Sequence, residues 1–445
     1  MRRVLLTLLI VPFLASSVRS APPPASVLLI SVDTLRSDRM SSYGYERNTS
    51  PHIDRLLGEG VRFTEARTVE PLTAPALATM LISLPPHEHG SSRNGLPVRP
   101  DLPSLPRVLR RHGFKTAAFV GSWTLRKNLW EMNDHFDDYE AVLTSSRWLG
   151  LWSREAKAED LNKRALAWIA DHGKTDPGRP FFLWVHYVEP HSPYVLQKEF
   201  LEQIGPPPDG DPKSRSYRYD SEIAYVDDQI AKLLAGVADR VPGEKPLTVF
   251  VSDHGESLGE HDYWGHGRNL FEPTLRIPMG ITWTGHIEPG VTEAPAMIGD
   301  LASTIVGLLG FEVPDFFQGF DWTGVLIQKA PAPTDRVTFY ETHKGAVSPM
   351  EERARVRQQG LLEVARLEGS RKEIYRHKDD IRSVFDVATD QGELDNLVAA
   401  DSQLSEPLQL WLLTVQKGLA LADDLPPPSL TAEDVEALRA LGYID

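Results

Sequence analysis

Four short segments that are almost continuously apolar constrain the fold of this chain more than any other feature. They are residues 26–32 (SVLLISV), 116–120 (TAAFV), 181–188 (FFLWVHYV) and 247–252 (LTVFVS). A strand carries apolar residues on both faces when helices cover both sides of its sheet. Helical patterns separate these runs, most clearly at residues 221–234, and a second helix is expected at residues 295–310. The sequence therefore predicts an α/β fold with a mostly parallel sheet flanked by helices.

The texture of the sequence changes from about residue 336 onward. Shorter and more polar segments follow, among them VTFYET, LLEVARL and SVFDV, and these favour edge or antiparallel strands. A short C-terminal helix is expected at residues 431–442, where a Thr and an Asp three residues later resemble a capping box. We therefore predict a main domain over residues 22–335 and a smaller α+β subdomain with a small antiparallel sheet over residues 336–445.

The N-terminus, residues 1–21, has the layout of a secretory signal peptide. It begins with two arginines, continues with an apolar run at residues 4–14, and ends in small residues up to Ala21. The run is shorter than the ~20 residues that span a bilayer comfortably, which favours a cleaved signal over an uncleaved anchor. We expect an exported protein, periplasmic or extracellular, that contacts a membrane only if this segment is retained.

Composition argues against several classes of protein. The chain has 47 Lys and Arg against 62 Asp and Glu, a net charge of −15, which disfavours nucleic acid or an anionic membrane as the main partner. It has no cysteine, which excludes disulfides, zinc–thiolate sites, iron–sulfur clusters and cysteine nucleophiles. Any chemistry must use oxygen and nitrogen groups.

Ionisable side chains follow three of the predicted strands. Asp33 comes directly after the first strand, His191 shortly after the third, and Asp253 and His254 directly after the fourth. Open parallel sheets bind ligands beyond the carboxyl ends of their strands, so these side chains are expected at one edge of the sheet. A single Asp after a strand is more often a helix cap or turn former, but three strand ends together favour a site.

Thr73 opens the helix-forming segment TAPALATMLISL. A group at a helix N-terminus lies beside free N–H groups and the positive end of the helix dipole, where a sulfate or phosphate group is stabilised. Plain helix capping by Thr73 is the alternative, and only the cluster at the strand ends makes an anion site the better interpretation.

The chain carrying these residues resembles the sulfatase family of the alkaline phosphatase superfamily. Residues 32–66 are similar to the family's first metal-binding block, and residues 73–90 (TAPALATMLISLPPHEHG) to its nucleophile block. EPHSPY at residues 189–194 is similar to its substrate-histidine block, and SDHGESLGEHDYWGHG at residues 252–267 to its second metal block. FDVATDQGELDNL and LRALGY look like its C-terminal signatures. The ordered blocks span nearly the whole chain after the signal segment.

The resemblance implies a cation site and a nucleophile. Asp33, Asp253 and His254, together with Thr73, would bind one divalent cation, and Thr73 would be the attacking group. The family favours Ca²⁺, and Mg²⁺ or Mn²⁺ also suits two carboxylates with one imidazole. Thr34 follows Asp33 where many relatives have a second Asp, which leaves one carboxylate at that strand end.

Two histidines complete the catalytic set that the resemblance implies. His191 would donate to an ester oxygen of the substrate, and His266 would be the general acid at the leaving group. The expected substrate is a small molecule, glycan or lipid that carries an anionic ester.

This chain departs from the family at the nucleophile and at the sulfate-binding positions. Relatives carry a Cys or Ser that is converted to formylglycine, then a Pro and an Arg, where this chain has Thr73, Pro75 and Leu77. Ser122 and Thr124 stand where relatives have a sulfate-binding Lys and a His. We therefore expect no formylglycine.

An unmodified Thr favours phosphate esters over sulfate esters. A formylglycine hydrate can expel sulfate with its second hydroxyl, whereas a Thr ester must be cleaved by water or by an acceptor alcohol. The first interpretation is therefore an exported hydrolase with a covalent Thr intermediate. Two alternatives stay open: a transferase of the phosphoglycerol or phosphoethanolamine type, and a catalytically weak pseudo-sulfatase that binds anionic glycans.

Other conspicuous residues receive structural interpretations. Large aromatic side chains such as Trp184 are expected in the core rather than on a sugar-binding surface. Asp227-Asp228 is interpreted as solvated helix charge, and His343 in YETHKG is expected to lie away from the site.

Overall fold

The computed structural model of the chain describes residues 25–143, 156–207, 210–211, 213–347, 355–398, 403–423 and 425. The predicted signal segment, residues 1–21, and the predicted helix at residues 431–442 lie outside these ranges. Among the helices within them, none combines the length and the apolarity that crossing a bilayer requires.

A sheet of eight strands, in the order β11-β2-β10-β7-β1-β6-β4-β5, organises the molecule. β1 (Val27–Val32) lies parallel between β6 (Phe181–Tyr187) and β7 (Leu247–Ser252). β4 (Lys115–Val120) continues the parallel arrangement beyond β6, whereas β10 (Met279–Thr282) runs antiparallel to β7. The four predicted runs are thus adjacent parallel strands, and the predicted α/β class is confirmed.

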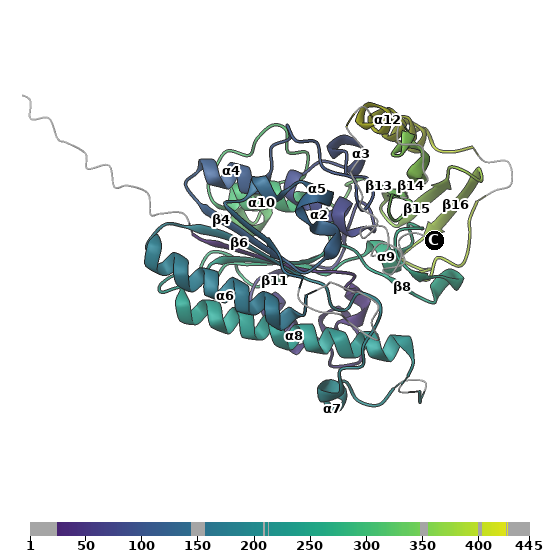
Figure 1. Ribbon diagram of the computed structural model, residues 1–445. Coiled ribbons are helices and arrows are strands. Elements are labelled where there is room, and N and C mark those ends of the chain that lie inside the picture. Colours follow the sequence, from purple (N-terminus) through teal and green to yellow (C-terminus); the bar gives the residue numbers. More distant parts are fainter. Residues whose placement is uncertain are drawn as a thin grey trace, which may run out of the picture.

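Helices cover both faces of this sheet (Figure 1). α6 (Ala158–Thr175) and α8 (Arg215–Arg240) pack against each other on one face. α2 (Thr73–Ile82), α4 (Leu105–Arg111) and α10 (Asp300–Leu308) lie on the other face. The remaining helices are α1 (Pro51–Gly58), α3 (Pro86–His89), α5 (Lys127–Trp130), α7 (Leu201–Ile204), α9 (Glu272–Leu275), α11 (Thr323–Gln328) and α12 (Glu406–Ala422).

The side chains of β1 show why the predicted strands are apolar without interruption. Val27 and Leu29 belong to the core cluster that includes α2, whereas Leu28, Ile30 and Val32 belong to the cluster that includes α8. Successive residues of a strand point to opposite faces, so a strand between two helical layers buries side chains on both faces, and Ser31, the polar residue of β1, is buried with the others.

The register of the three central strands places their carboxyl ends side by side. Val32, the last residue of β1, pairs with Tyr187 of β6 and with Ser252 of β7. The backbone N–H of Asp33 donates to the Tyr187 carbonyl at 2.9 Å, and that of Asp253 donates to the Val32 carbonyl at 3.3 Å. The segments that follow these strands therefore begin from one edge of the sheet.

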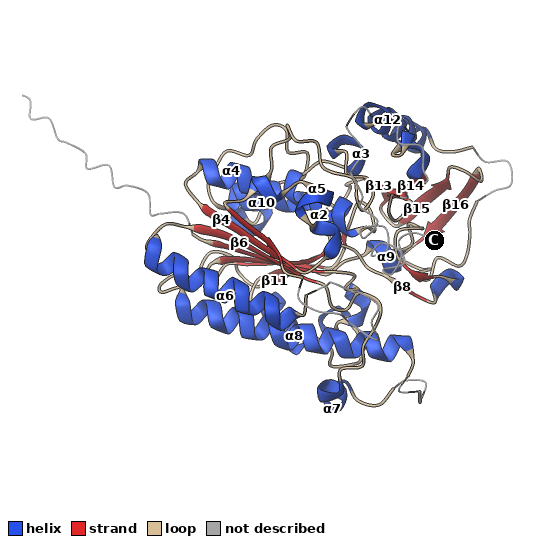
Figure 2. Ribbon diagram, in the orientation of Figure 1, coloured by secondary structure: helices blue, strands red, loops and turns tan. Residues whose placement is uncertain are grey.

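A smaller antiparallel sheet, in the order β13-β14-β15-β16, is formed later in the chain. Its strands are β13 (Thr338–His343), β14 (Leu361–Glu368), β15 (Arg371–Arg376) and β16 (Ile381–Asp386). Figure 2 shows this sheet and α12 at one end of the molecule, apart from the central sheet. β15 (RKEIYR) was not predicted, because its polar residues give no apolar run; the domain boundary at residue 335 stays a prediction.

The short strands that remain belong to the large sheet or to two small pairs. They are β2 (Val61–Phe63), β5 (Asp138–Ala141) and β11 (Gly290–Thr292) in the large sheet, and β3 (Ala66–Arg67), β12 (Ala296–Met297), β8 (Ser257–Leu258) and β9 (Trp264–Gly265) in the pairs. The helix expected at residues 295–310 begins only at Asp300, because residues 296–297 pair with β3.

Asp227 is a buried helix cap, which corrects its interpretation as solvated charge. Its side chain is 1% exposed and accepts hydrogen bonds from the backbone N–H groups of His52, at 3.0 Å, and Ile53, at 2.7 Å. These groups open α1 and would otherwise lack partners. Asp227 therefore joins α8 to α1.

Replacing Asp227 should separate its charge from its capping role. Burial raises the pKa of Asp227 from 3.8 to about 7, so its stabilising contribution is present at low pH and is lost as the pH rises through 7. Asp227→Asn keeps an acceptor and should be at least as stable as the wild type at pH 8. Asp227→Ala should lose about 1–2 kcal/mol because two N–H groups lose their partner. Urea unfolding at pH 5 and pH 8 measures the free energy of unfolding of both variants. An Asp227→Asn variant that is less stable than the wild type only at pH 8 would contradict this account.

Candidate active site

Three residues that follow the central strands meet at one edge of the sheet. One ligand atom from each of Asp33, Asp253 and His254 lies within 4.8 Å of the other two. His254 Nε2 is 3.7 Å from Asp33 Oδ1 and 3.5 Å from Asp253 Oδ2. All three side chains are buried. The structure thus brings together the three residues that the sequence assigned to a cation, while their role stays a prediction.

Thr73 reaches the same point from the N-terminus of α2. Its Oγ1 lies 3.5 Å from Asp33 Oδ2 and 3.5 Å from His254 Nε2, and the residue is fully buried. Thr73 is the first residue of α2, and the N-cap is Leu72, which makes no side-chain capping bond. The Thr73 hydroxyl therefore does not cap the helix. The alternative interpretation of Thr73 as a simple cap is wrong.

The donor set fits a divalent cation. Asp253 Oδ1 accepts hydrogen bonds from the backbone N–H groups of Thr34, at 3.1 Å, and His254, at 2.7 Å, whereas its buried Oδ2 accepts none. Burial, and then the nearby carboxylate of Asp33, raise the pKa of Asp253 well above its usual value. Two carboxylates, one imidazole and one hydroxyl at these separations are ligands that a hard cation prefers.

His191 and His266 lie beside the cation site. The ring of His266 is 4.5 Å from that of His254 and 5.2 Å from that of His191, measured between centroids. His266 Nδ1 is 3.3 Å from Oε1 of Glu256, whose other oxygen accepts a hydrogen bond from the Tyr194 hydroxyl. The sequence singled out both histidines but not Glu256, although it lies in the SDHGES segment three residues after Asp253.

Burial lowers the pKa of two imidazoles at this site, those of His254 and His266. Burial, and then the neighbouring His191, hold the pKa of His266 well below its usual value. Burial, and then His266, do the same to the pKa of His254. A lowered pKa favours the neutral form of these two rings, and a neutral imidazole is the form that binds a metal ion.

The positions where relatives carry cationic groups are neutral here. Leu77 is fully buried in the core cluster of α2. The hydroxyls of Ser122 and Thr124 are both buried and lie 2.9 Å apart, bonded to each other. No Lys or Arg replaces the family's cationic groups at these three positions.

The segment that carries Thr73 is also held by residues that sequence reasoning did not connect to it. Asn94 Oδ1 accepts a hydrogen bond from the backbone N–H of Ala74 at 3.1 Å. The carboxylate of Glu70 accepts hydrogen bonds from the backbone N–H of His343, at 3.1 Å, and lies 3.0 Å from Nδ1 of the same residue. His343 therefore contacts the segment that precedes Thr73, and its long sequence separation from Glu70 hid this contact.

A second contact of the same kind joins α3 to β13. His87 Nδ1 is 2.9 Å from Oε1 of Glu341, and both side chains are buried. Glu341 and His343 belong to β13, so the small sheet contacts α3, which packs against α2.

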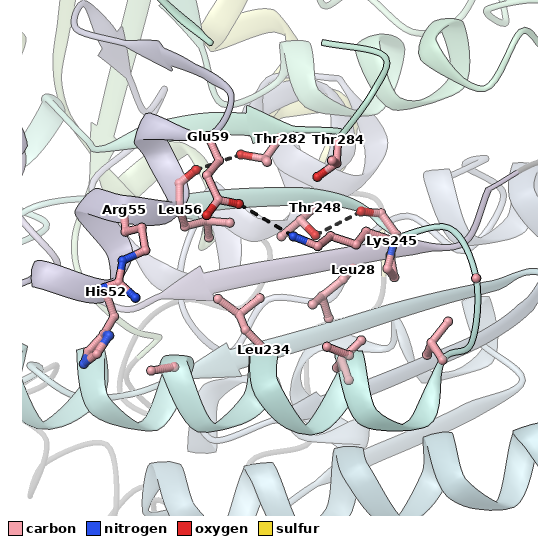
Figure 3. A pocket seen from close by; sticks show the side chains of 16 residues that line it. Leu28, His52, Arg55, Leu56, Glu59, Leu234, Lys245, Thr248, Thr282 and Thr284 are labelled. Atoms are coloured by element: carbon pink, nitrogen blue, oxygen red, sulfur yellow. Dashed lines mark hydrogen bonds and ion pairs between the residues drawn. The ribbon is translucent and has the colours of Figure 1, made fainter. Parts of the chain in front are cut away.

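A pocket of ≈ 450 Å³ lies at the opposite edge of the sheet. Leu28 and Thr248, near the starts of β1 and β7, line it, and the Lys245 ammonium lies 3.9 Å from the Glu59 carboxylate at its rim (Figure 3). The residues that line this pocket include none of the strand-end cluster. Its position at the amino ends of the strands separates it from the candidate chemistry.

The chain is similar to known proteins over most of its length. The family model described as Sulfatase matches residues 25–311, and the model described as N-sulphoglucosamine sulphohydrolase, C-terminal, matches residues 259–416. A choline-sulfatase of Rhizobium meliloti is 24% identical over 84% of this chain and 82% of its own length.

Two solved structures share the fold. The phosphonate monoester hydrolase from Silicibacter pomeroyi has a TM-score of 0.65 and 21% identity, over 92% of this chain and 98% of its own. A protein solved with its substrate D-glucosamine-2-N,6-O-disulfate has a TM-score of 0.69 and 19% identity, over 92% of this chain and 100% of its own.

Chelation should destabilise the protein through this site. Buried carboxylates that face each other without a cation repel, and a ligand at 100 times its Kd stabilises the folded state by about 2.7 kcal/mol. Treatment with a chelator should therefore lower the melting temperature of the wild type. An Asp253→Asn, His254→Ala double variant should melt lower from the outset and respond little to chelator. An equal fall in melting temperature on chelation in both proteins would show that the cation does not bind at this location.

Proposed function

This chain belongs to the sulfatase family and is a sulfatase-family hydrolase; from that premise we propose an exported, cation-dependent enzyme that cleaves anionic esters with unmodified Thr73 as its nucleophile. The observation that carries the proposal is the position of Thr73 Oγ1, 3.5 Å from both Asp33 Oδ2 and His254 Nε2. A hydroxyl is a weak nucleophile, so Thr73 needs a nearby group that lowers the free energy of ionising it. A bound divalent cation would supply that effect and would offset charge on an ester oxygen.

The residues of the chain then divide the work of the first step. Thr73 Oγ attacks the sulfur or phosphorus atom, and the bond from that atom to the leaving alcohol oxygen breaks. The Thr73 hydroxyl proton passes to Asp33 Oδ2, which lies 3.5 Å from Thr73 Oγ1. His191 donates to an ester oxygen, and His266 donates a proton to the departing alcohol.

The second step returns the enzyme to its starting state. Neutral His266 accepts a proton from water, whose oxygen attacks the sulfur or phosphorus atom of the Thr73 ester. The bond from that atom to Thr73 Oγ breaks, Asp33 returns the proton to Thr73 Oγ, and sulfate or phosphate is released. His266 must be protonated before the first step, although its surroundings disfavour the charge in the protein alone. The bound ester brings negative charge that favours the imidazolium, and Glu256 holds Nδ1 so that Nε2 serves the substrate.

We propose that phosphate esters are preferred over sulfate esters. Thr73 has no second hydroxyl with which to expel sulfate, and Leu77, Ser122 and Thr124 supply no cation to replace the family's sulfate-binding groups. A phosphate monoester carries more negative charge than a sulfate ester, so a divalent cation at a helix N-terminus stabilises the bound phosphate ester more strongly. The fold is shared with a phosphonate monoester hydrolase, which supports this preference without deciding it.

The substrate alcohol is proposed to be a sugar. One structural relative was solved with D-glucosamine-2-N,6-O-disulfate, an anionic sugar ester. The neutral side chains at residues 77, 122 and 124 also motivate the competing proposal of a pseudo-sulfatase that binds such glycans without turnover. Turnover of any ester in the assays below would exclude that alternative. A transferase would be recognised by an ester of an added alcohol among the products.

Replacing Thr73 tests the mechanism. Thr73→Ala should lower kcat by at least about 10³-fold, because the attacking oxygen is gone, while Thr73→Ser should keep measurable turnover. Purified enzyme should be assayed with aryl phosphate, aryl phosphonate, phosphodiester and aryl sulfate in the presence of Ca²⁺, Mg²⁺ or Mn²⁺. Intact-mass analysis of the wild type should show residue 73 as plain threonine.

Two outcomes would overturn parts of this proposal separately. Full activity in Thr73→Ala would overturn the covalent mechanism. Efficient aryl sulfate hydrolysis without any phosphoesterase activity would overturn the substrate preference while leaving the nucleophile in place.

Export is tested on the mature N-terminus. Protein expressed from the full sequence should be recovered outside the cytoplasm with an N-terminus near Pro22, as N-terminal sequencing would show. Recovery of protein with an intact Met1 in the membrane fraction would show that residues 1–21 are an uncleaved anchor and not a cleaved signal peptide.

A further inference from the structure

We propose that His186 is a positioning residue for Asp33, and that a hydrogen-bonded relay from Trp184 through Ser31 fixes the proton of His186 on the nitrogen that faces this carboxylate. The inference rests on the cation proposed above, because its consequence is the affinity of that cation. It gives a role to His186, a buried histidine that lies beside Asp33 of the cation site.

The three members of the relay lie on one face of two neighbouring strands. Ser31 of β1 is directly opposite His186 of β6 in the parallel register, and Trp184 precedes His186 by two residues. Residues two apart on a strand share a face. Trp184 belongs to the core cluster on the side of α2, the helix that carries Thr73. Trp184, Ser31 and His186 are all fully buried, so water does not compete for their hydrogen bonds.

The order of donors follows from what each group can do. The Trp184 indole N–H can only donate, and it lies 2.8 Å from Ser31 Oγ, which accepts. The Ser31 hydroxyl keeps its own proton to donate, and His186 Nδ1 lies 2.9 Å away. In the proposed relay the Ser31 hydroxyl donates to Nδ1, which then carries no proton. In a neutral imidazole the proton is then on Nε2. The opposite direction, from an Nδ1–H to the second lone pair of Ser31 Oγ, is the outcome that the spectra below test.

The protonated nitrogen faces the cation site. His186 Nε2 lies 3.7 Å from Asp33 Oδ2, the same oxygen that lies 3.5 Å from Thr73 Oγ1. At 3.7 Å the contact is longer than a direct hydrogen bond, and a shift of under 1 Å by the carboxylate would close it. The N–H of His186 thus favours one orientation of Asp33, with Oδ1 toward His254 at 3.7 Å.

A neutral donor suits this position better than a charged one. Outer groups that hold metal-binding side chains orient them and tune their basicity, and their loss typically lowers metal affinity by 10- to 100-fold. A Lys or Arg beside Asp33 would orient the carboxylate but would also repel the cation. The tautomer set by Ser31 provides the orientation without the charge, at a strand end where Thr34 offers no second carboxylate.

Cation affinity is the quantity that tests this role. Isothermal titration calorimetry of metal-stripped protein with Ca²⁺ and Mn²⁺ should show 10- to 100-fold weaker binding by His186→Leu than by the wild type. His186→Gln places an amide N–H₂ near the position of Nε2 and should recover much of that loss. Ser31→Ala releases the tautomer and should weaken binding less than His186→Leu does.

His135 offers a matched control. It is also buried, and its Nδ1 is bonded to a serine hydroxyl, Ser104 Oγ, at 2.8 Å, but it does not contact the cation site. His135→Leu should therefore leave cation affinity unchanged even if it lowers stability. A loss of affinity in His135→Leu equal to that in His186→Leu would show a general effect of removing a buried histidine and would overturn the proposal.

The tautomer itself is read in the cation-free protein. Long-range ¹H–¹⁵N correlation spectra of histidine-labelled protein should show His186, identified by its absence in His186→Gln, with a proton on Nε2 and none on Nδ1. A proton on Nδ1 would overturn the relay. If the wild type binds a cation and His186→Leu binds it with the same affinity, this inference alone is overturned. If the wild type binds no cation, the proposed cation is overturned as well.

Discussion

Two carboxylates buried beside each other, those of Asp33 and Asp253, are the constraint on which the rest of this structure depends. The register of β1 and β7 fixes them there, because Val32 and Ser252 pair directly and leave the next residues no freedom to separate. Burial and the carboxylate of Asp33 raise the pKa of Asp253, and burial lowers the pKa of His254 and His266. The proposed cation would offset the repulsion between the two carboxylates.

The same arrangement explains why a plain threonine can be proposed as a nucleophile. In the proposed mechanism Thr73 needs no base beyond Asp33, which also belongs to the proposed cation site. Other side chains around it orient the site: Asn94 holds the first turn of α2, and Glu256 contacts His266. The proposed preference for phosphate over sulfate rests on positions 77, 122 and 124, which lack the family's positive charge.

The sequence predicted what depends on local pattern and on strand order. Continuous apolar runs predicted β1, β4, β6 and β7, and polar residues directly or shortly after three of them predicted the candidate site. It did not predict β15, whose alternation of polar residues has no apolar run, or the burial of Asp227, whose partners are backbone N–H groups on a helix far away in the sequence. Glu256 was overlooked for the opposite reason: it lies inside a recognised segment, but only the fold shows that its carboxylate reaches His266.

Some contacts could not be predicted from the residues at all, because they join distant parts of the chain. Glu70 with His343, and His87 with Glu341, are of this kind. Each pairs a residue near the nucleophile helix with one in β13.

These contacts bear on the order in which the parts of the protein are completed during synthesis. A growing chain that has not yet reached β13 leaves the carboxylate of Glu70 and the ring of His87 without these partners, in a buried region. The segments around α2 therefore gain these two contacts only after residues 338–343 have been made. A fragment that ends before β13 would carry Asp33, Thr73, Asp253 and His254 and would still lack both contacts.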